Sequence, residues 1–265
     1  ASVALSGGKA VHYLCDEENN WYPDLEDIKS KITSRTKGIV VINPNNPTGS
    51  VYPRHILQQI VDVAREHELV VFTDEIYEKI IYDGAEAINL ATLTGDDVLC
   101  LTFSGLSKAY RVCGYRAGWV AITGPKHEAA NYIEGITLLA SMRLCSNVPA
   151  QHAIQTALGG YQSIDALVAP GGRLHEQRDV AYRMLNEIDG ISCNQSDGAL
   201  YLFPKVDTEK VNIVDDEQKI LFSHGGAFNW HKPDHFRLVF LPDVQTLTDA
   251  LNRLGEFLSD YKQRA

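Results

Sequence analysis

Residues 38–49, GIVVINPNNPTG, join a run of β-branched residues to a dense cluster of turn-forming residues. The run at 38–42 is typical of a strand that is buried on both faces. The Asn, Pro and Gly residues at 43–49 favour a turn where that strand ends. A helical pattern follows at 54–68, and a second apolar run, LVVFT at 69–73, ends at Asp74. The stretch therefore predicts a strand, a helix and a second buried strand.

The same alternation extends outward from this unit. We predict further strands at 10–14, 98–103 and 119–122, and helices at 24–33, 126–140 and 150–158. Alternating strands and helices predict an α/β fold, with a mostly parallel sheet sandwiched by helices. From Pro170 the pattern changes to a helix at 173–188, strands at 199–204 and 236–241, and a helix at 247–261. We therefore predict a large domain at 1–169 and a smaller α+β domain at 170–265.

Composition restricts the class of protein. The chain has 265 residues, 45% hydrophobic and 22% charged, with a formal net charge of −10. An acidic chain argues against nucleic acid or an anionic membrane as the partner, and no apolar run is long enough to span a membrane. The five cysteines are widely spread, with no CxxC pair and no metal-ligand spacing. They indicate reduced thiols in a reducing compartment, and we expect no metal.

Two places in the chain suggest missing sequence. The first residues, ASVAL, are typical of the middle of a domain, so we expect that an N-terminal part is absent. Residues 215–218, DDEQ, are suited to capping a helix, yet the strand-like KILF follows at once at 219–222. We hypothesise an internal gap near 218/219.

Three polar clusters follow three of the predicted strands, at 43–49, 74–77 and 104–108. The carboxyl ends of parallel strands meet at one edge of a sheet, and ligands bind beyond that edge. We therefore expect the three clusters to form a single site.

The third cluster carries a family resemblance. Residues 103–119, FSGLSKAYRVCGYRAGW, resemble the pyridoxal 5'-phosphate (PLP) lysine signature of class I and II aminotransferases, which have PLP-transferase fold type I. The resemblance implies that Lys108 carries PLP on its amine and that Arg116 holds the cofactor phosphate. The family's phosphate-binding Ser is replaced by Gly105, so we assign that role to Ser107 rather than Ser104. The alternative is an exposed Lys and Arg on a loop.

The other two clusters match the same family. The resemblance implies that Asn46, directly before Pro47, binds the phenolic oxygen of PLP near the substrate carboxylate, with Tyr77 beside it. It also implies that Asp74 pairs with the pyridine nitrogen and keeps it protonated. The alternatives are an ordinary turn for Asn46 and a helix cap for Asp74.

An arginine late in the chain completes the predicted site. Arg237 lies inside an apolar run, DHFRLVFLP at 234–242, where a cation is costly unless it meets an anion. The resemblance implies that Arg237 clamps the substrate α-carboxylate; the alternative is a surface arginine.

Two stretches suggest the substrate. Residues 140–151, ASMRLCSNVPAQ, and 225–230, GGAFNW, resemble alanine aminotransferases, which implies that L-alanine and 2-oxoglutarate give pyruvate and L-glutamate in a cytoplasmic homodimer. Arg143 has either a role in the site or a structural one, in an ion pair or a dimer contact. The alternatives are an aminotransferase for aromatic, branched-chain or aspartate substrates, a carbon–sulfur lyase, or a PLP-binding regulatory domain. The family's phosphate loop and ring-stacking aromatic are expected upstream of Ala1.

Overall fold

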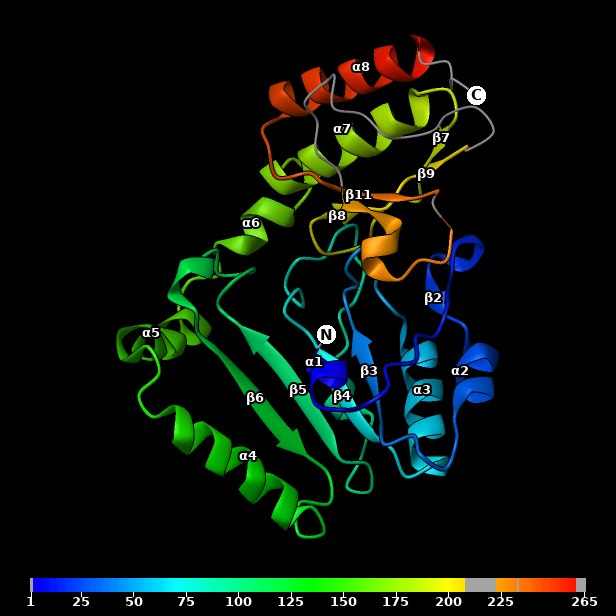
Figure 1. Cartoon of the computed structure of the whole chain (residues 1–265). Helices are drawn as coiled ribbons and strands as arrows, with labels where there is room; N and C mark the ends of the chain where they lie inside the picture. The colour runs from blue at the N-terminus through cyan, green and yellow to red at the C-terminus, as the bar shows by residue number, and fades with distance from the viewer. Residues whose placement is uncertain (1, 208–222, 233, 261–265) are drawn as a thin grey trace.

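The computed structural model describes residues 2–207, 223–232 and 234–260 (Figure 1). Its helices are α1 (Ser2–Leu5), α2 (Leu25–Lys31), α3 (Arg54–Glu66), α4 (Ala130–Arg143), α5 (Val148–Gly159), α6 (Ile164–Val168), α7 (Arg173–Glu187) and α8 (Val244–Asp260). Its strands are β1 (Cys15–Asp16), β2 (Tyr22–Pro23), β3 (Gly38–Ile42), β4 (Val70–Asp74), β5 (Cys100–Gly105), β6 (Gly118–Thr123), β7 (Ile191–Ser192), β8 (Tyr201–Leu202), β9 (Lys205–Val206), β10 (Ser223–His224) and β11 (Phe236–Val239).

The central sheet has the order β3-β4-β5-β6. The first three strands are parallel and β6 is antiparallel to β5, so the prediction of a mostly parallel sheet is confirmed. The register pairs Ile42 with Asp74 and Asp74 with Phe103, so the carboxyl ends of the parallel strands are level. Residues that follow these strands therefore begin at one edge of the sheet.

One face of this sheet packs against α3. Its core includes Ile39, Val41, Val71 and Cys100 from the strands, all less than 9% exposed, together with the apolar side of α3. Burial of these side chains is the main stabilising contribution in this layer. On the other face Val40, Phe103 and Val120 are 53%, 40% and 40% exposed, so the described residues cover the two faces unequally.

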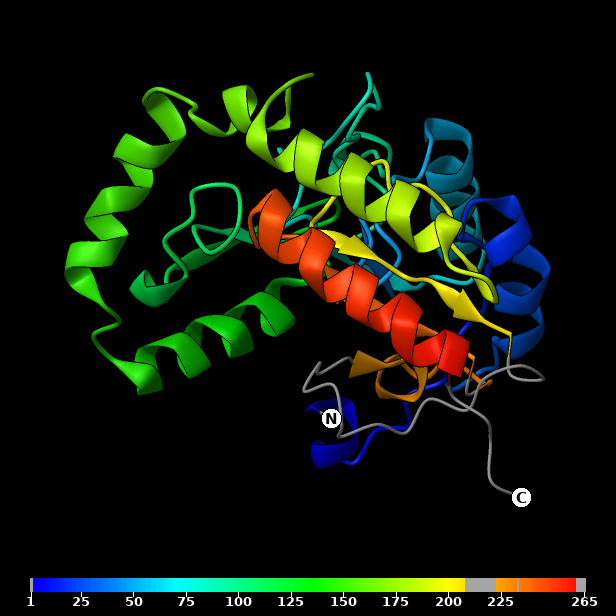
Figure 2. The same ribbon diagram turned by 90° about the horizontal axis from the view of Figure 1, so that it is seen from above.

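The C-terminal part forms a second sheet, ordered β10-β11-β8 and wholly antiparallel. Helices α7 and α8 lie side by side along it (Figures 1 and 2). The core beneath them contains Tyr77, Ile80 and Ala109 as well as residues from β8 and β11. This one core therefore joins residues on both sides of position 170, and the division into domains at 1–169 and 170–265 stays a prediction.

Helices α4 and α5 project away from the rest of the molecule in both views (Figures 1 and 2). No residue of α4 is buried, and Leu138, Leu139 and Met142 are more than half exposed. Among the described residues, no helix has the length and apolar character needed to cross a membrane.

Two sequence predictions differ from the structure or fall outside it. The strand predicted at 10–14 is wrong: the polar groups there bond elsewhere, with the Tyr13 hydroxyl donating to Val40 O and the Leu14 amide to Asp27. A strand needs a partner along its edge, and the neighbouring pair begins only at β1. The hypothesised gap at 218/219 lies outside the described residues.

A buried cation links α7 to the loop after β4. Arg178 is 1% exposed, its Nη2 lies 2.6 Å from Asp83 and from Asp179, and its Nη1 donates to Ser196 O. Its guanidinium also lies 4.6 Å from the ring centre of Tyr82. A buried charge is tolerated when its donors are satisfied in this way.

Replacing Arg178 should therefore destabilise the fold. Arg178→Met keeps the apolar stem but removes the Arg178 donors from Asp83, Asp179 and Ser196 O, so we expect a loss of roughly 2–3 kcal/mol in the free energy of unfolding. Urea unfolding measures this loss. The control is Arg183→Met on the same helix, because Arg183 pairs with Glu187 on an exposed surface and should change stability little. Equal effects in the two variants would contradict the assignment.

Candidate active site

The turn after β3 is held by its own side chains. The Asn45 Nδ2 donates to Ile42 O, and the Thr48 hydroxyl donates to Asn45 Oδ1. The backbone of Gly49, at φ +73°, lies against the C-terminal part: a Cβ there would meet Ser196 Cβ at 2.3 Å and Tyr201 O at 2.7 Å. These contacts fix the backbone on both sides of Asn46.

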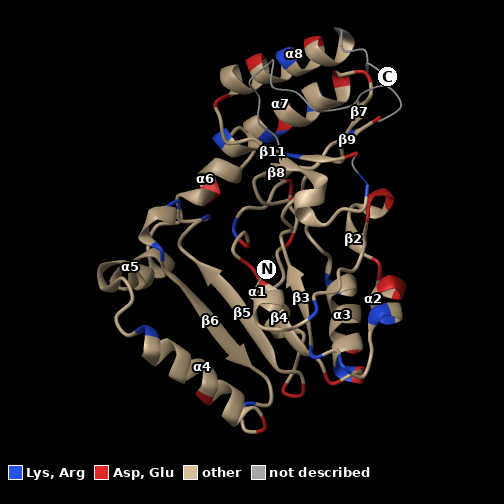
Figure 3. Cartoon of the chain, viewed as in Figure 1, with Lys and Arg blue, Asp and Glu red and all other residues tan. Residues whose placement is uncertain are grey.

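Asp74 ends β4 and is the one charged residue in the four strands of the central sheet. Figure 3 shows β5 and β6 in tan, without Lys, Arg, Asp or Glu. Burial is the largest effect on it and raises its pKa, while the Ile76 amide and the Lys108 ammonium act in the opposite direction. The carboxylate and the ammonium therefore lie close enough to interact. Because the net shift in its pKa is upward, the Lys108 ammonium offsets the effect of burial on Asp74 only in part, and a further cation would stabilise the carboxylate.

Tyr77 lies between Lys108 and the C-terminal part. The Lys108 Nζ is 5.5 Å from the centre of the Tyr77 ring, and the Tyr77 hydroxyl shares a 2.6 Å hydrogen bond with the Tyr201 hydroxyl. Tyr77 is 3% exposed, and burial is the main reason that its pKa is raised. The phenol therefore stays protonated at neutral pH and is available as a donor.

Arg237 reaches the same place from β11. Its Nη1 donates to Asn46 Oδ1 at 2.9 Å, and its guanidinium lies 4.6 Å from the ring centre of Tyr201 and 4.8 Å from that of Phe228. Its Nε is buried and has no hydrogen-bond partner among the described residues. A fork with an unused donor is suited to an anion with two oxygens.

The structure thus brings together five of the predicted site residues: Asn46, Asp74, Tyr77, Lys108 and Arg237. The other two are placed differently. Ser107 is half-buried. Arg116 is exposed, its backbone has a φ of +49°, and its Nη1 donates to Cys113 O. Neither makes a hydrogen bond to those five in the part of the chain that the structure describes. Arg143 ends α4, where it is exposed, donates to Cys145 O and forms no ion pair with a described residue.

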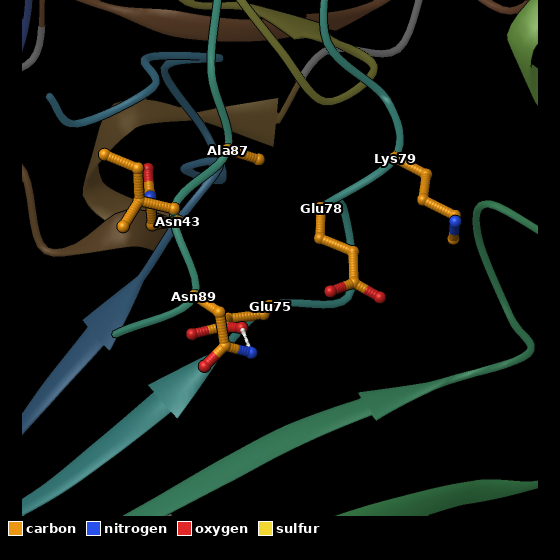
Figure 4. A pocket seen from close by; sticks show the side chains of 7 residues that line it. Asn43, Glu75, Glu78, Lys79, Ala87 and Asn89 are labelled. Atoms are coloured by element: carbon orange, nitrogen blue, oxygen red, sulfur yellow. Dashed lines mark hydrogen bonds between the residues drawn. The ribbon is translucent and has the colours of Figure 1, made fainter. Parts of the chain in front are cut away.

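A separate pocket of about 280 Å³ lies beside the ends of β3 and β4 (Figure 4). It is lined by Asn43, Glu75, Glu78, Lys79, Ala87, Ile88 and Asn89. None of these was assigned a role in the predicted site, although Asn43 and Glu75 belong to the clusters 43–49 and 74–77. Glu75 accepts hydrogen bonds from Thr73, Asn89 and the Leu90 amide, and burial raises its pKa to about 7. Glu75 therefore anchors the segment around Asn89 to the strand that carries Asp74.

The fold and the grouped side chains define a PLP-dependent enzyme architecture of fold type I. Residues 1–254 match the family model for aminotransferase class I and II, and the chain belongs to this family, whose members depend on PLP. It is 61% identical to the alanine aminotransferase of Mycobacterium tuberculosis and 57% identical to the glutamate-pyruvate aminotransferase AlaA of Escherichia coli. Both matches cover 99% of this chain but 63% and 67% of the relative.

A solved structure of an aminotransferase from Escherichia coli agrees closely in three dimensions. Its TM-score is 0.96 at 56% identity, and the match covers 99% of this chain and 67% of that one. The chain therefore spans about two thirds of the length of these relatives.

The side chains present fit PLP. The under-compensated Asp74 is suited to a protonated ring nitrogen, and Lys108 supplies an amine for an aldehyde. The amide of Asn46 and the phenol of Tyr77 are donors suited to an ionised phenolic oxygen.

Two contributors to this site were missed from sequence, Tyr201 and Phe228. Phe228 lies inside the GGAFNW stretch that resembles alanine aminotransferases, and Tyr201 lies inside the apolar run 199–204. A tyrosine in an apolar strand is a usable signal, because its buried hydroxyl must find a partner.

Gly49 gives a direct test of how this site is built. Gly49→Ala places a Cβ against Ser196 and Tyr201 at a positive φ, so we expect a loss of roughly 3 kcal/mol in stability. Gly84→Ala is the matched control, since Gly84 has φ +77° but nothing within 4 Å of its Cβ. It should lose only about 1 kcal/mol from backbone strain. Thermal unfolding compares the two, and a Gly49 variant as stable as the Gly84 variant would show that the contact is not tight.

Proposed function

We propose that the protein transfers the amino group of L-alanine to 2-oxoglutarate, giving pyruvate and L-glutamate, with PLP as its cofactor. The observation that supports this proposal most strongly is the grouping of charges at the sheet edge. Lys108 lies beside the Tyr77 ring and interacts electrostatically with Asp74, and Arg237 donates a hydrogen bond to Asn46. The relatives named as alanine and glutamate-pyruvate aminotransferases support the choice of substrates.

The proposal gives a role to each of the predicted site residues. Lys108 would hold PLP through its amine and would serve as the base that takes the proton from the substrate α-carbon. Asp74 pairs with the ring nitrogen, and Asn46 and Tyr77 donate to the phenolic oxygen. Ser107 and Arg116 contact the phosphate. When bound, PLP supplies the electron sink for the bond that breaks at the α-carbon.

Arg237 binds the substrate carboxylate. Among the described residues its Nε has no partner and is available to donate to a ligand, and its Nη1 donates to the neutral Asn46 Oδ1. A carboxylate is the stronger acceptor, so it can replace that oxygen. Because the same fork serves amino acid and oxoacid in turn, the kinetics should be ping-pong.

We further propose that the protein works as a homodimer in the cytoplasm. The exposed apolar side chains on α4 and on the open face of the sheet are suited to being covered by protein. The five cysteines are free, which fits a reducing compartment.

The lysine assignment can be tested by spectroscopy. Full-length protein with PLP should show the visible absorbance of a lysine-linked cofactor and should form pyruvate from alanine and 2-oxoglutarate. Lys108→Ala should lose both, because no other amine takes its place. Lys79→Ala, from the neighbouring pocket, is the control and should keep both. An unchanged spectrum in Lys108→Ala would falsify the assignment. Aspartate, tyrosine and cystathionine tested alongside give the substrate preference.

The carboxylate clamp can be tested by steady-state kinetics. Arg237→Ala removes charge-assisted hydrogen bonds, so KM for alanine and for 2-oxoglutarate should each rise roughly tenfold or more. The exposed Arg183→Ala is the control and should leave both values unchanged. A rise for only one substrate would show that Arg237 is not the shared carboxylate site.

A further inference from the structure

Tyr201 touches two site residues that come from different parts of the chain. It lies in β8, is 6% exposed, and its hydroxyl lies 2.6 Å from the Tyr77 hydroxyl. The two rings meet edge to face, with centres 5.6 Å apart. The Tyr201 ring also faces the guanidinium of Arg237 at 4.6 Å. Tyr201 is therefore the side chain that connects the proposed cofactor seat with the proposed carboxylate clamp.

The backbone of Tyr201 is held from two sides. Residue Val239 of β11 pairs with it in the antiparallel sheet, so Tyr201 and Arg237 lie on neighbouring strands. On the other side its carbonyl lies so near Gly49 that a Cβ there would meet it at 2.7 Å. A shift of the Tyr201 backbone away from Tyr77 or Arg237 would therefore also displace the turn that carries Asn46.

The shared hydrogen bond constrains which hydroxyl donates. Only one proton lies between two hydroxyl oxygens, and each phenol has one proton to give. If Tyr77 donates to a ligand oxygen, Tyr201 must be the donor to Tyr77. That bond polarises the Tyr77 hydroxyl and strengthens the hydrogen bond that it gives in turn.

We propose that Tyr201 is a positioning residue with two separable effects: its hydroxyl directs and strengthens Tyr77 as a donor, and its ring holds the Arg237 fork in place. The proposal rests on the proposed function, in which Tyr77 contacts the cofactor and Arg237 the substrate carboxylate. In this proposal Tyr201 acts through Tyr77 and Arg237, and not by direct contact with the cofactor or the substrate.

Two variants separate these effects in the full-length protein loaded with PLP. Tyr201→Phe keeps the ring and removes the hydroxyl. A weaker donor to the ionised phenolic oxygen favours the form with one more proton, so the pH midpoint of the visible absorbance should rise by about half a unit. KM for both substrates should stay within about twofold. Tyr201→Leu also removes the ring face, and both KM values should rise about fivefold or more.

Tyr82→Phe is the matched control. Tyr82 is 2% exposed, lies in the same core, and its hydroxyl donates to Ala199 O, two residues from Tyr201. Among the described residues, its hydrogen bond is to Ala199 O and its ring contacts are with His175, Phe240 and Arg178, and none of these interactions is with Tyr77 or Arg237. It should lower the unfolding midpoint without moving the absorbance titration or either KM.

The possible outcomes distinguish a failure of the role of Tyr201 from a failure of the proposed function. A wild-type protein without lysine-linked absorbance refutes the proposed function, and the role of Tyr201 with it. An active wild type whose Tyr201→Phe variant titrates like wild type, or like Tyr82→Phe, refutes the role of Tyr201 alone. The Tyr201→Phe titration is decisive even where Tyr201→Leu does not fold, because the phenylalanine ring preserves the packing. A raised midpoint with unchanged KM values supports the proposal.

Discussion

The in-register pairing of β3, β4 and β5 is the constraint on which the site depends. Backbone hydrogen bonds continue past the strands, from Asn43 N to Asp74 O and from Glu75 N to Phe103 O, so the three strand ends stay level. Each following segment then starts from a fixed point, the turn with Asn46, the turn with Tyr77 and the loop with Lys108. A slip of one residue in any pair would turn the strand-end side chains to the other face of the sheet.

The four strands of the central sheet contain very few charged residues. Asp74 is the single charged residue in the four strands of the central sheet, and burial disfavours its ionised form. The Lys108 ammonium offsets this only in part. Such an arrangement is costly for a folded chain alone and would become favourable in the proposed function, where a cationic ring pairs with Asp74. The incompletely compensated charge of Asp74 lies in the proposed active site. By contrast, the charge of Arg178 on α7 is paired with Asp83 and Asp179.

Sequence reasoning reached the fold and the strand-end residues, because periodicity and turn chemistry are local properties. It placed the ends of β3 and β4 within a residue and found the N-cap Asp24 of α2. It misplaced a strand at 10–14, since pairing depends on a partner elsewhere in the chain. Tyr201 was missed for the same reason. Its contacts with the site are made with Tyr77, which is 124 positions away in the sequence, and with Arg237 on the neighbouring strand β11. The roles of Ser107 and Arg116 stay predictions, because they rest on family pattern alone.

The amide of Asn46 faces the guanidinium of Arg237 as a neutral placeholder. An incoming molecule gains over this placeholder only if it brings a formal negative charge, since a neutral acceptor would exchange one ordinary hydrogen bond for another. Decarboxylated amines bring no acceptor and amino-acid amides only a neutral one, so in the proposed role of Arg237 they would gain less from the fork than a carboxylate does. In the proposed role of Arg237, competition with Asn46 for the guanidinium would therefore favour substrates that carry a carboxylate over analogues that lack one.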